Sequence, residues 1–459
     1  MGIVGIKPEY IQELMSMLSV FDNWGKDKEY ISFEADNPAS GAVNILVFKK
    51  RTIDGNSILL ERVIPFHTLE GTVKTVLSVK EFKRLVNEIT NTRNPKQLFI
   101  EGDSKQQYSY MWVEGGQNRV ISNIGLQPDV KYDMLDATET LLDPVVDQPV
   151  YACGITPTEA RTLKQCALLI GKNIDYIPLL SHVIMSLSST GKRTYGSMDR
   201  YKVVRHTCSD EETGDTETYT EEHGPFIIGL PQTVARLIKE MTPARKNKTT
   251  YKVGNSQLYI SMSSNYGLVE TPKGNIGFTY TPSDSKLVRL GSAVSFTMTP
   301  PQQTAAWGAI KVNGDSLVDL LSEIDEGAQS NKKTFVKLSN PEVGSICISG
   351  FQVVNQGADP IFMKKHLNVT QTELLENLGV YNLKFLIGAL NSLRRTQNSK
   401  LGDIYILAPN PQDPSPLHIY AGVSSVLAKN FNSKERNLWN IVNTTSNIVI
   451  NQSTIQSAS

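Results

Sequence analysis

Short runs in which apolar and polar residues alternate recur along the whole chain. Alternation with a period of two is typical of β-strands that bury one face. The clearest runs are 30–33, 43–48, 108–113, 251–253, 257–261 and 344–349. The pattern therefore predicts a protein built mostly of strands.

Amphipathic helices interrupt the strands in each third of the chain. One pattern, a strand-like entry followed by apolar residues at i, i+3, i+4 and i+7, appears three times, in segments 76–89, 226–241 and 378–393. Each third also has an earlier helix, expected over 8–22, 156–170 and 315–324. Thr156 and Glu159 form a capping box at the start of the second of these, and Asp315 is the expected N-cap of the third.

The separation of these patterns, about 150 residues, is too long for a solenoid and indicates three copies of one domain. The Pro- and Asp-rich stretch 142–149 and the segment 283–304 are the expected linkers. We therefore predict domains over 1–142, 150–285 and 302–459. An acidic loop over 209–223 and a polar tail from Asn443 are expected to lie outside the packed core.

The amino-acid composition is typical of a globular protein without a membrane-spanning segment. The 459 residues are 40% hydrophobic and 20% charged, and no apolar run is long enough to span a membrane. The chain begins without a secretory signal pattern, so a cytoplasmic protein is expected. Lys plus Arg and Asp plus Glu number 46 each, so any electrostatic function must come from the segregation of charge.

Motifs of enzymes and metal sites are missing from the sequence. It contains no phosphate-binding loop, dinucleotide fingerprint, nucleophile elbow or H-E-x-x-H helix. The six histidines are dispersed, and the four cysteines lack metal-ligand spacing and are expected to be reduced thiols. We therefore predict no catalytic residue, no metal site and no cofactor.

The segment Ser197-Met-Asp-Arg-Tyr-Lys-Val-Val204 mixes charged and apolar residues between two predicted strands. It resembles, without a gap, the A-T-D-R-Y-R-L-A element of bacterial sliding clamps, the β subunits of replicative DNA polymerases. Asp199, Arg200 and Tyr201 are identical to that element. The strand, proline and helix in 226–241 and the segment Gly379–Leu390 are similar to further elements of the family, so the resemblance covers about residues 8–425.

The resemblance implies an α+β fold of three clamp domains, each a curved antiparallel sheet with two helices. Two chains would form a homodimer, closed head to tail into a ring around double-stranded DNA. Such a ring is a processivity factor and not an enzyme; its partners are a clamp loader, DNA polymerase and other clamp-motif proteins. Because encirclement needs only weak phosphate contacts, zero net charge is compatible with this function.

The resemblance also assigns two sets of residues. Basic residues expected to face DNA are Lys80, Lys83, Arg84, Arg161, Lys164, Arg236, Lys239, Lys384, Arg394 and Arg395. A pocket between the second and third domains would bind partner peptides of the Q-x-x-L-F type. Its expected wall is Met198, Arg200, Tyr201, Lys202 and Val203, where Met198, Lys202 and Val203 replace the family's Thr, Arg and Leu.

Several features depart from the family pattern. The chain continues past the usual final strand through 434–459, and the early helix of the third copy carries Asp319, Glu323, Asp325 and Glu326. These departures, with the acidic loop, indicate a divergent clamp, consistent with a bacteriophage origin. Two alternatives remain open: a β-rich structural or assembly protein of clamp-like architecture, and a hydrolase whose site has no recognisable motif.

Overall fold

Most elements of the chain are defined in a computed structural model. It describes residues 2–21, 29–35, 41–49, 56–90, 97–102, 108–113, 120–123, 141–142, 151–169, 182–187, 192–198, 202–213, 218–220, 226–242, 259–262, 266–279, 309–330, 332–354, 357–358, 361–371, 378–396, 400–407, 417–421 and 424–428. Antiparallel sheets and a few helices make up this part of the chain, which confirms the predicted α+β class. No described helix is both long and apolar enough to cross a membrane.

Contacts divide the chain into two compact units, each described here by itself. Unit 1 comprises 1–164, 212–224 and 230–282, and unit 2 comprises 165–211, 225–229 and 283–459. Neither unit coincides with one of the domains predicted from the sequence, because each unit contains strands from two neighbouring repeats. The three-domain boundaries therefore stay a prediction.

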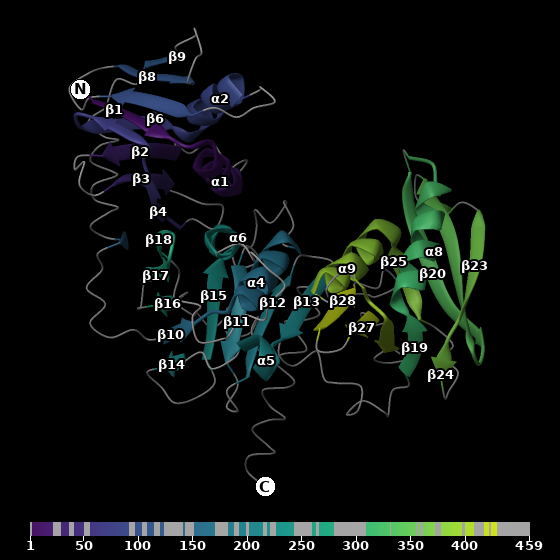
Figure 1. Ribbon diagram of the computed structural model, residues 1–459. Coiled ribbons are helices and arrows are strands. Elements are labelled where there is room, and N and C mark those ends of the chain that lie inside the picture. Colours follow the sequence, from purple (N-terminus) through teal and green to yellow (C-terminus); the bar gives the residue numbers. More distant parts are fainter. Residues whose placement is uncertain are drawn as a thin grey trace. The chain divides into compact units, whose positions relative to one another are not determined.

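Unit 1 contains two antiparallel sheets (Figure 1). A five-stranded sheet has the order β5-β1-β7-β8-β9, formed by β1 (Gly2–Ile6), β5 (Thr68–Glu70), β7 (Leu98–Gly102), β8 (Tyr108–Val113) and β9 (Val120–Asn123). A nine-stranded sheet has the order β14-β10-β16-β17-β18-β4-β3-β2-β6, formed by β2 (Glu29–Ala35), β3 (Ala42–Lys49), β4 (Ile58–Pro65), β6 (Val73–Ser78), β10 (Tyr151–Gly154), β14 (Thr218–Thr220), β16 (Tyr259–Met262), β17 (Tyr266–Thr271) and β18 (Gly274–Thr279).

The helices of unit 1 have their expected positions with small changes at the ends. They are α1 (Pro8–Leu18), α2 (Val79–Thr90), α6 (Gln232–Met241) and the first part of α4 (Pro157–Leu169). The helix predicted over 8–22 is α-helical only to Leu18 and continues as a 3₁₀ turn over Ser19–Phe21. Phe82 of α2 packs against Phe33 of β2 with ring centroids 5.3 Å apart, which fixes α2 on the nine-stranded sheet.

Unit 2 also contains two antiparallel sheets. The nine-stranded sheet β15-β11-β12-β13-β28-β27-β26-β19-β24 is formed by β11 (His182–Leu187), β12 (Arg193–Met198), β13 (Lys202–Thr207), β15 (Phe226–Pro231), β19 (Ala309–Asn313), β24 (Thr370–Gln371), β26 (Asp403–Leu407), β27 (Leu417–Ala421) and β28 (Ser424–Ala428). The other sheet is formed by β20 (Lys333–Glu342), β21 (Ser345–Val354), β22 (Gly357–Ala358), β23 (Met363–Asn368) and β25 (Gly379–Asn382).

Helices α8 (Gly314–Glu326) and α9 (Leu383–Thr396) complete unit 2 and share its core. Leu321 and Ile324 of α8, and Leu386 and Leu390 of α9, are almost fully buried against sheet residues such as Ile348. Leu386 and Leu390 are among the positions of the 378–393 segment whose spacing predicted one apolar face. Figure 1 shows α9 beside β28, and α8 beside β20 and β23.

Each nine-stranded sheet joins strands from two predicted repeats. In unit 1, β18 of the second repeat pairs with β4 of the first, with Gly277 opposite Leu59. In unit 2, β28 of the third repeat pairs with β13 of the second, with Val426 opposite Val204. Both pairings are antiparallel, so the same kind of junction occurs twice along the chain.

Two expectations about helix capping have different outcomes. The capping box is confirmed: the Glu159 backbone amide donates to Thr156 Oγ1 at 3.2 Å, and the Thr156 amide donates to Glu159 Oε2 at 3.0 Å. Asp315 as N-cap is wrong. The cap is Asn313, whose Oδ1 accepts from the Ser316 amide at 2.9 Å, whereas Asp315 accepts from the backbone amide of Leu401 at 3.2 Å.

The acidic segment differs from its prediction, and the cysteines are in the predicted reduced state. The segment 209–223 is not a loop throughout, because it contains the short helix α5 (Asp210–Thr213) and strand β14, which pairs with β10. All four cysteines are buried and free, and burial raises the pKa of Cys166 to about 12. The polar tail from Asn443 lies outside the described residues.

Replacing the N-cap of α8 tests the corrected assignment. We expect Asn313→Ala to accelerate hydrogen exchange at the Ser316 amide, because that amide loses its acceptor, and to destabilise the helix by roughly 1 kcal/mol. Asp319→Ala, at an exposed position further along α8, is the control and should leave Ser316 protected. Unchanged exchange at Ser316 in Asn313→Ala would contradict the assignment.

Candidate nucleic-acid interface

Basic residues predicted to face DNA come together where α4 and α6 lie side by side in unit 1. Lys164 of α4 forms an ion pair with Glu240 of α6. Arg161 lies one turn before Lys164 and is exposed. Lys239 is half-buried, and its pKa is lowered first by burial and then by the positive charges of its neighbours, with Glu240 opposing the shift. The cations therefore lie within electrostatic reach of one another.

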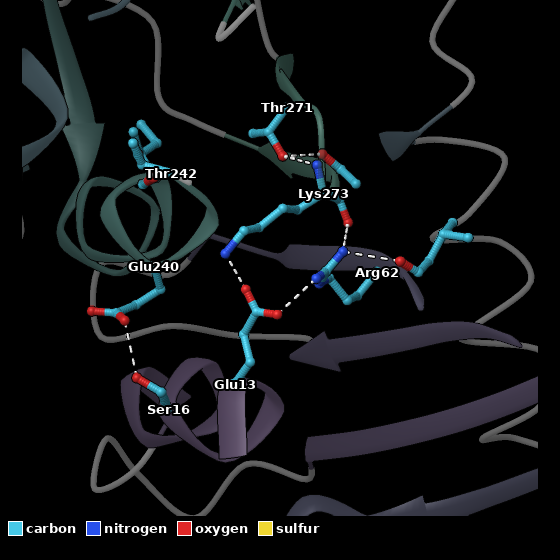
Figure 2. Close-up of polar contacts among 10 residues, drawn as sticks. Glu13, Ser16, Arg62, Glu240, Thr242, Thr271 and Lys273 are labelled. Carbon is cyan, nitrogen blue, oxygen red and sulfur yellow. Dashed lines mark hydrogen bonds and ion pairs between the residues drawn. The ribbon is translucent and has the colours of Figure 1, made fainter. Parts of the chain in front are cut away.

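A second carboxylate, Glu13 of α1, binds two further cations (Figure 2). Arg62 of β4 donates from Nη2 to Glu13 Oε2 at 2.9 Å, and Lys273 donates from Nζ to Glu13 Oε1. Arg62 also donates from Nη1 to the Lys273 carbonyl at 2.5 Å and to the Val63 carbonyl at 2.9 Å. Arg62 is thus held by three acceptors and is nearly buried.

The turn between β17 and β18 positions Lys273. The Lys273 amide donates to Thr271 Oγ1 at 3.1 Å, and Thr271 Oγ1 donates to the Gly274 carbonyl at 2.7 Å. Gly274 has a φ of 136°, and a Cβ there would lie 2.1 Å from the Glu61 carbonyl. Only glycine therefore lets this turn approach β4 closely enough to bring Lys273 to Glu13.

Glu240 also links helix α6 to helix α1. Ser16 of α1 donates from Oγ to Glu240 Oε2 at 2.9 Å (Figure 2), whereas Lys164 donates to the other carboxylate oxygen, Oε1. We call the whole group the junction cluster, because α1 and β4 belong to the first predicted domain and the other elements to the second. Its charged members are Glu13, Arg62, Arg161, Lys164, Lys239, Glu240 and Lys273.

Both carboxylates of the junction cluster are ionised at neutral pH. Burial alone would raise the pKa of Glu13, but the hydrogen bonds from Lys273 and Arg62 outweigh it and hold the pKa below its usual value. The pKa of Glu240 is also lowered, because the hydrogen bonds from Lys164 and Ser16 outweigh burial. The junction cluster carries five cations and two anions, so it is a positive site with internal counter-charges.

Sequence reasoning found only part of this cluster. Arg161, Lys164 and Lys239 were predicted from their helices, and the structure brings them together. Glu13 and Lys273 were missed, since 260 positions separate them and neither belongs to a motif. One signal was present for Arg62: it interrupts the apolar run of β4, where a charged residue must find partners.

The other predicted basic residues lie on α2, α6 and α9. On α2, Lys80 and Arg84 are exposed and Lys83 is half-buried; on α6, Arg236 is half-buried. In unit 2, Lys384 at the start of α9 is exposed, while Arg394 pairs with Asp315, Nε to Oδ1, at 3.3 Å. The side chain of Arg395 lies outside the described residues.

The third repeat presents acid on its early helix, as its sequence predicts. Asp319, Glu323 and Glu326 of α8 are exposed, and Asp325 is half-buried. Glu323 pairs with Lys365 of β23 at 2.6 Å. The charge on the helices is therefore unequal between the repeats.

The predicted peptide pocket falls almost entirely outside the described residues. Arg200 and Tyr201 lie there, as do the side chains of Met198 and Lys202. Val203 is described: it lies in β13, opposite Met198 of β12 and Leu427 of β28, and its side chain is fully buried. The pocket itself stays a prediction.

Comparisons with known proteins identify the fold. No protein-family model and no curated protein sequence matches this chain. Among solved structures, a DNA polymerase III β subunit from Eubacterium rectale matches with a TM-score of 0.62 and 13% identity, covering 94% of this chain and 100% of that chain. The β clamp of Helicobacter pylori, bound to a DNA ligase peptide, matches with a TM-score of 0.60 and 12% identity over 94% and 99% of the two chains.

A third structure gives the same result. The DNA polymerase sliding clamp of Pseudomonas aeruginosa matches with a TM-score of 0.59 and 10% identity, over 94% of this chain and all of that one. The fold of this protein is therefore that of the bacterial β clamps. At identities this low the match concerns the fold alone.

The ion pairs of Glu13 predict a pH-dependent contribution to stability. Because its pKa is lower in the folded protein, the contribution is present above the unfolded value near 4.5 and is lost as pH falls below it. We expect Glu13→Gln to destabilise unit 1 by about 1–3 kcal/mol at pH 7, since Arg62 and Lys273 lose their anion. The deficit relative to the native protein should shrink as pH falls from about 5 to 3.

Thermal unfolding followed by circular dichroism at several pH values measures this difference. Glu323→Gln, which removes an exposed pair with Lys365, is the matched control and should have little effect at any pH. A deficit in Glu13→Gln that is equally large at pH 3 and pH 7 would contradict the pKa assignment.

Proposed function

We propose that this protein is a DNA sliding clamp, a processivity factor that encircles double-stranded DNA and tethers replication proteins to it. The β-clamp fold over 94% of the chain supports this general function. The protein would act as a ring and a binding platform and would catalyse no reaction. Its partners would be DNA, a clamp loader, a DNA polymerase and other proteins with clamp-binding peptides.

The proposal of a ring rests on the pairing of strands between neighbouring repeats, which the chain makes twice internally. After its first helix each repeat has a run of strands, which ends in β4, β13 and β23 respectively; after its second helix each has three more, ending in β9, β18 and β28. β4 pairs with β18 of the next repeat, and β13 with β28 of the next. Among the described residues, β23 pairs only with β21, and β9 only with β8.

β23 and β9 therefore stand at the corresponding positions of this series. Pairing β23 of one copy with β9 of another would repeat the junction that the chain makes twice internally. A strand edge with unpaired N–H and C=O groups is a template for such pairing. A head-to-tail contact made by both copies closes into a ring, and a homodimer would contain six repeats.

The junction cluster supports the contact with DNA. Its excess of cations is provided by helices α4 and α6 and the adjoining turn, which in this proposal face the central hole. Its internal carboxylates keep the excess modest, which suits a ring that is retained by topology and must slide along phosphates.

Tethering would use the pocket predicted from the Asp199-Arg-Tyr201 element. Apolar side chains of a partner peptide would anchor there, while Arg200 and Lys202 frame them. The DNA ligase peptide bound to the Helicobacter pylori clamp is an example of such a partner in a protein of the same fold.

Topological retention on DNA tests the proposed function. We expect the protein, loaded onto nicked circular duplex by a clamp loader, to stay on circles and to leave when the circles are linearised. Light scattering should give about twice the 50.8 kDa chain mass. A stable monomer that leaves circular and linear DNA equally would contradict a clamp and would favour a structural or assembly protein.

A peptide-binding measurement tests the pocket separately. We expect Tyr201→Ala to weaken binding of a Q-x-x-L-F peptide at least tenfold, because a central aromatic anchor is commonly a hot spot. The dimer and its retention on circular DNA should persist, since the substitution leaves the ring junctions intact. Unchanged peptide affinity would remove Tyr201 from the pocket.

A further inference from the structure

Two lysines of the junction cluster are already bound by carboxylates. Lys164 is paired with Glu240, and Lys273 with Glu13. By contrast, Lys239 and Arg161 form no ion pair with any carboxylate in the described part of the chain. With Arg62, which also pairs with Glu13, the cluster contains three cations neutralised within the protein and two available to an outside anion.

The carboxylate of Glu240 is fixed at both oxygens. Oε1 accepts from Lys164, and Oε2 accepts from Ser16 Oγ at 2.9 Å. A neutral hydroxyl on α1 thus orients the carboxylate, leaving its other oxygen facing Lys164. The side chain of Glu240 is 19% exposed and that of Lys164 is 32% exposed, so solvent reaches the lysine more readily than its partner.

We propose that Glu240, with Glu13 beside it, is a positioning residue that withholds lysines from DNA phosphate and so keeps the clamp's contact with the duplex weak. This inference rests on the proposed function. The sequence predicted that Lys164 contacts phosphate directly. In this proposal Lys164 is instead neutralised by Glu240 and contributes little to DNA binding.

A phosphate group binds a free ammonium group more strongly than a lysine that is already paired with a carboxylate. A free ammonium attracts phosphate and releases a condensed counterion, which gives each contact a slope of about 0.9 in log affinity against log salt. A lysine already paired with a fixed carboxylate presents almost no net charge. Phosphate must displace the carboxylate, so one ion pair is exchanged for another and little affinity is gained.

Removing the carboxylate should therefore tighten DNA binding. For the full-length Glu240→Gln dimer we expect several-fold higher affinity for linear duplex and a salt dependence steeper by about 0.9, because Lys164 becomes one further phosphate contact. Diffusion along DNA, followed by single-molecule imaging of loaded clamps, should slow. The double variant Glu240→Gln with Lys164→Gln should lose the gain, since the released cation is then absent.

Two further variants separate this effect from a change of net charge or of fold. Asp403→Asn raises the net charge by the same amount, but it breaks a pair with Lys311 between strands β19 and β26, and it should steepen the salt dependence less. Ser16→Ala keeps both charges and removes only the hydroxyl that orients Glu240; it should shift affinity in the same direction by a smaller factor.

The inference is overturned if Glu240→Gln binds duplex with unchanged affinity and salt dependence, or if the double variant keeps the whole gain. Either result leaves the clamp function in place when the native protein is retained on circular DNA. Loss of the native protein from circles would instead overturn the proposed function, whatever the variants show.

Discussion

Backbone hydrogen bonds between strands of neighbouring repeats are the constraint on which the rest of this structure depends. β18 pairs with β4 and β28 pairs with β13, so each nine-stranded sheet contains strands from two repeats. At the first junction, Asn275 of β18 donates to the Glu61 carboxylate of β4 at 2.8 Å, and Asn44 of the adjacent β3 donates to the same carboxylate at 3.3 Å. Because antiparallel pairing satisfies the backbone N–H and C=O groups that face the neighbouring strand, these junctions hold the strands of two repeats together in one sheet.

The pairing of β18 with β4 also determines where the charged residues of the junction cluster lie. The close approach of β18 to β4 sets the turn carrying Lys273 beside Arg62, and both then reach Glu13 of α1. A basic cluster assembled in this way carries its own counter-charges, since buried cations require anions. The weak contact that we propose with DNA is thus a consequence of how the first junction is stabilised.

Strand and helix positions were largely predictable, because an element that buries one face repeats its apolar residues with a regular period. That period can still be recognised when single residues deviate from it. The spacing of Leu386 and Leu390 in α9, and the capping box of Thr156 and Glu159, were read directly from the sequence and are confirmed. The cap of α8 was not: Asn313 and Asp315 are both good capping residues, and only the backbone position of the first helical turn decides between them.

The sequence by itself determined the α+β class, the repeated helices and three cations of the junction cluster, since these follow from local periodicity and residue type. Only the tertiary structure decided that Lys164 is paired with Glu240 and that Glu13 binds Lys273 across 260 positions. Such pairs depend on which strands meet at a junction, and alternation along one strand carries no information about its neighbour.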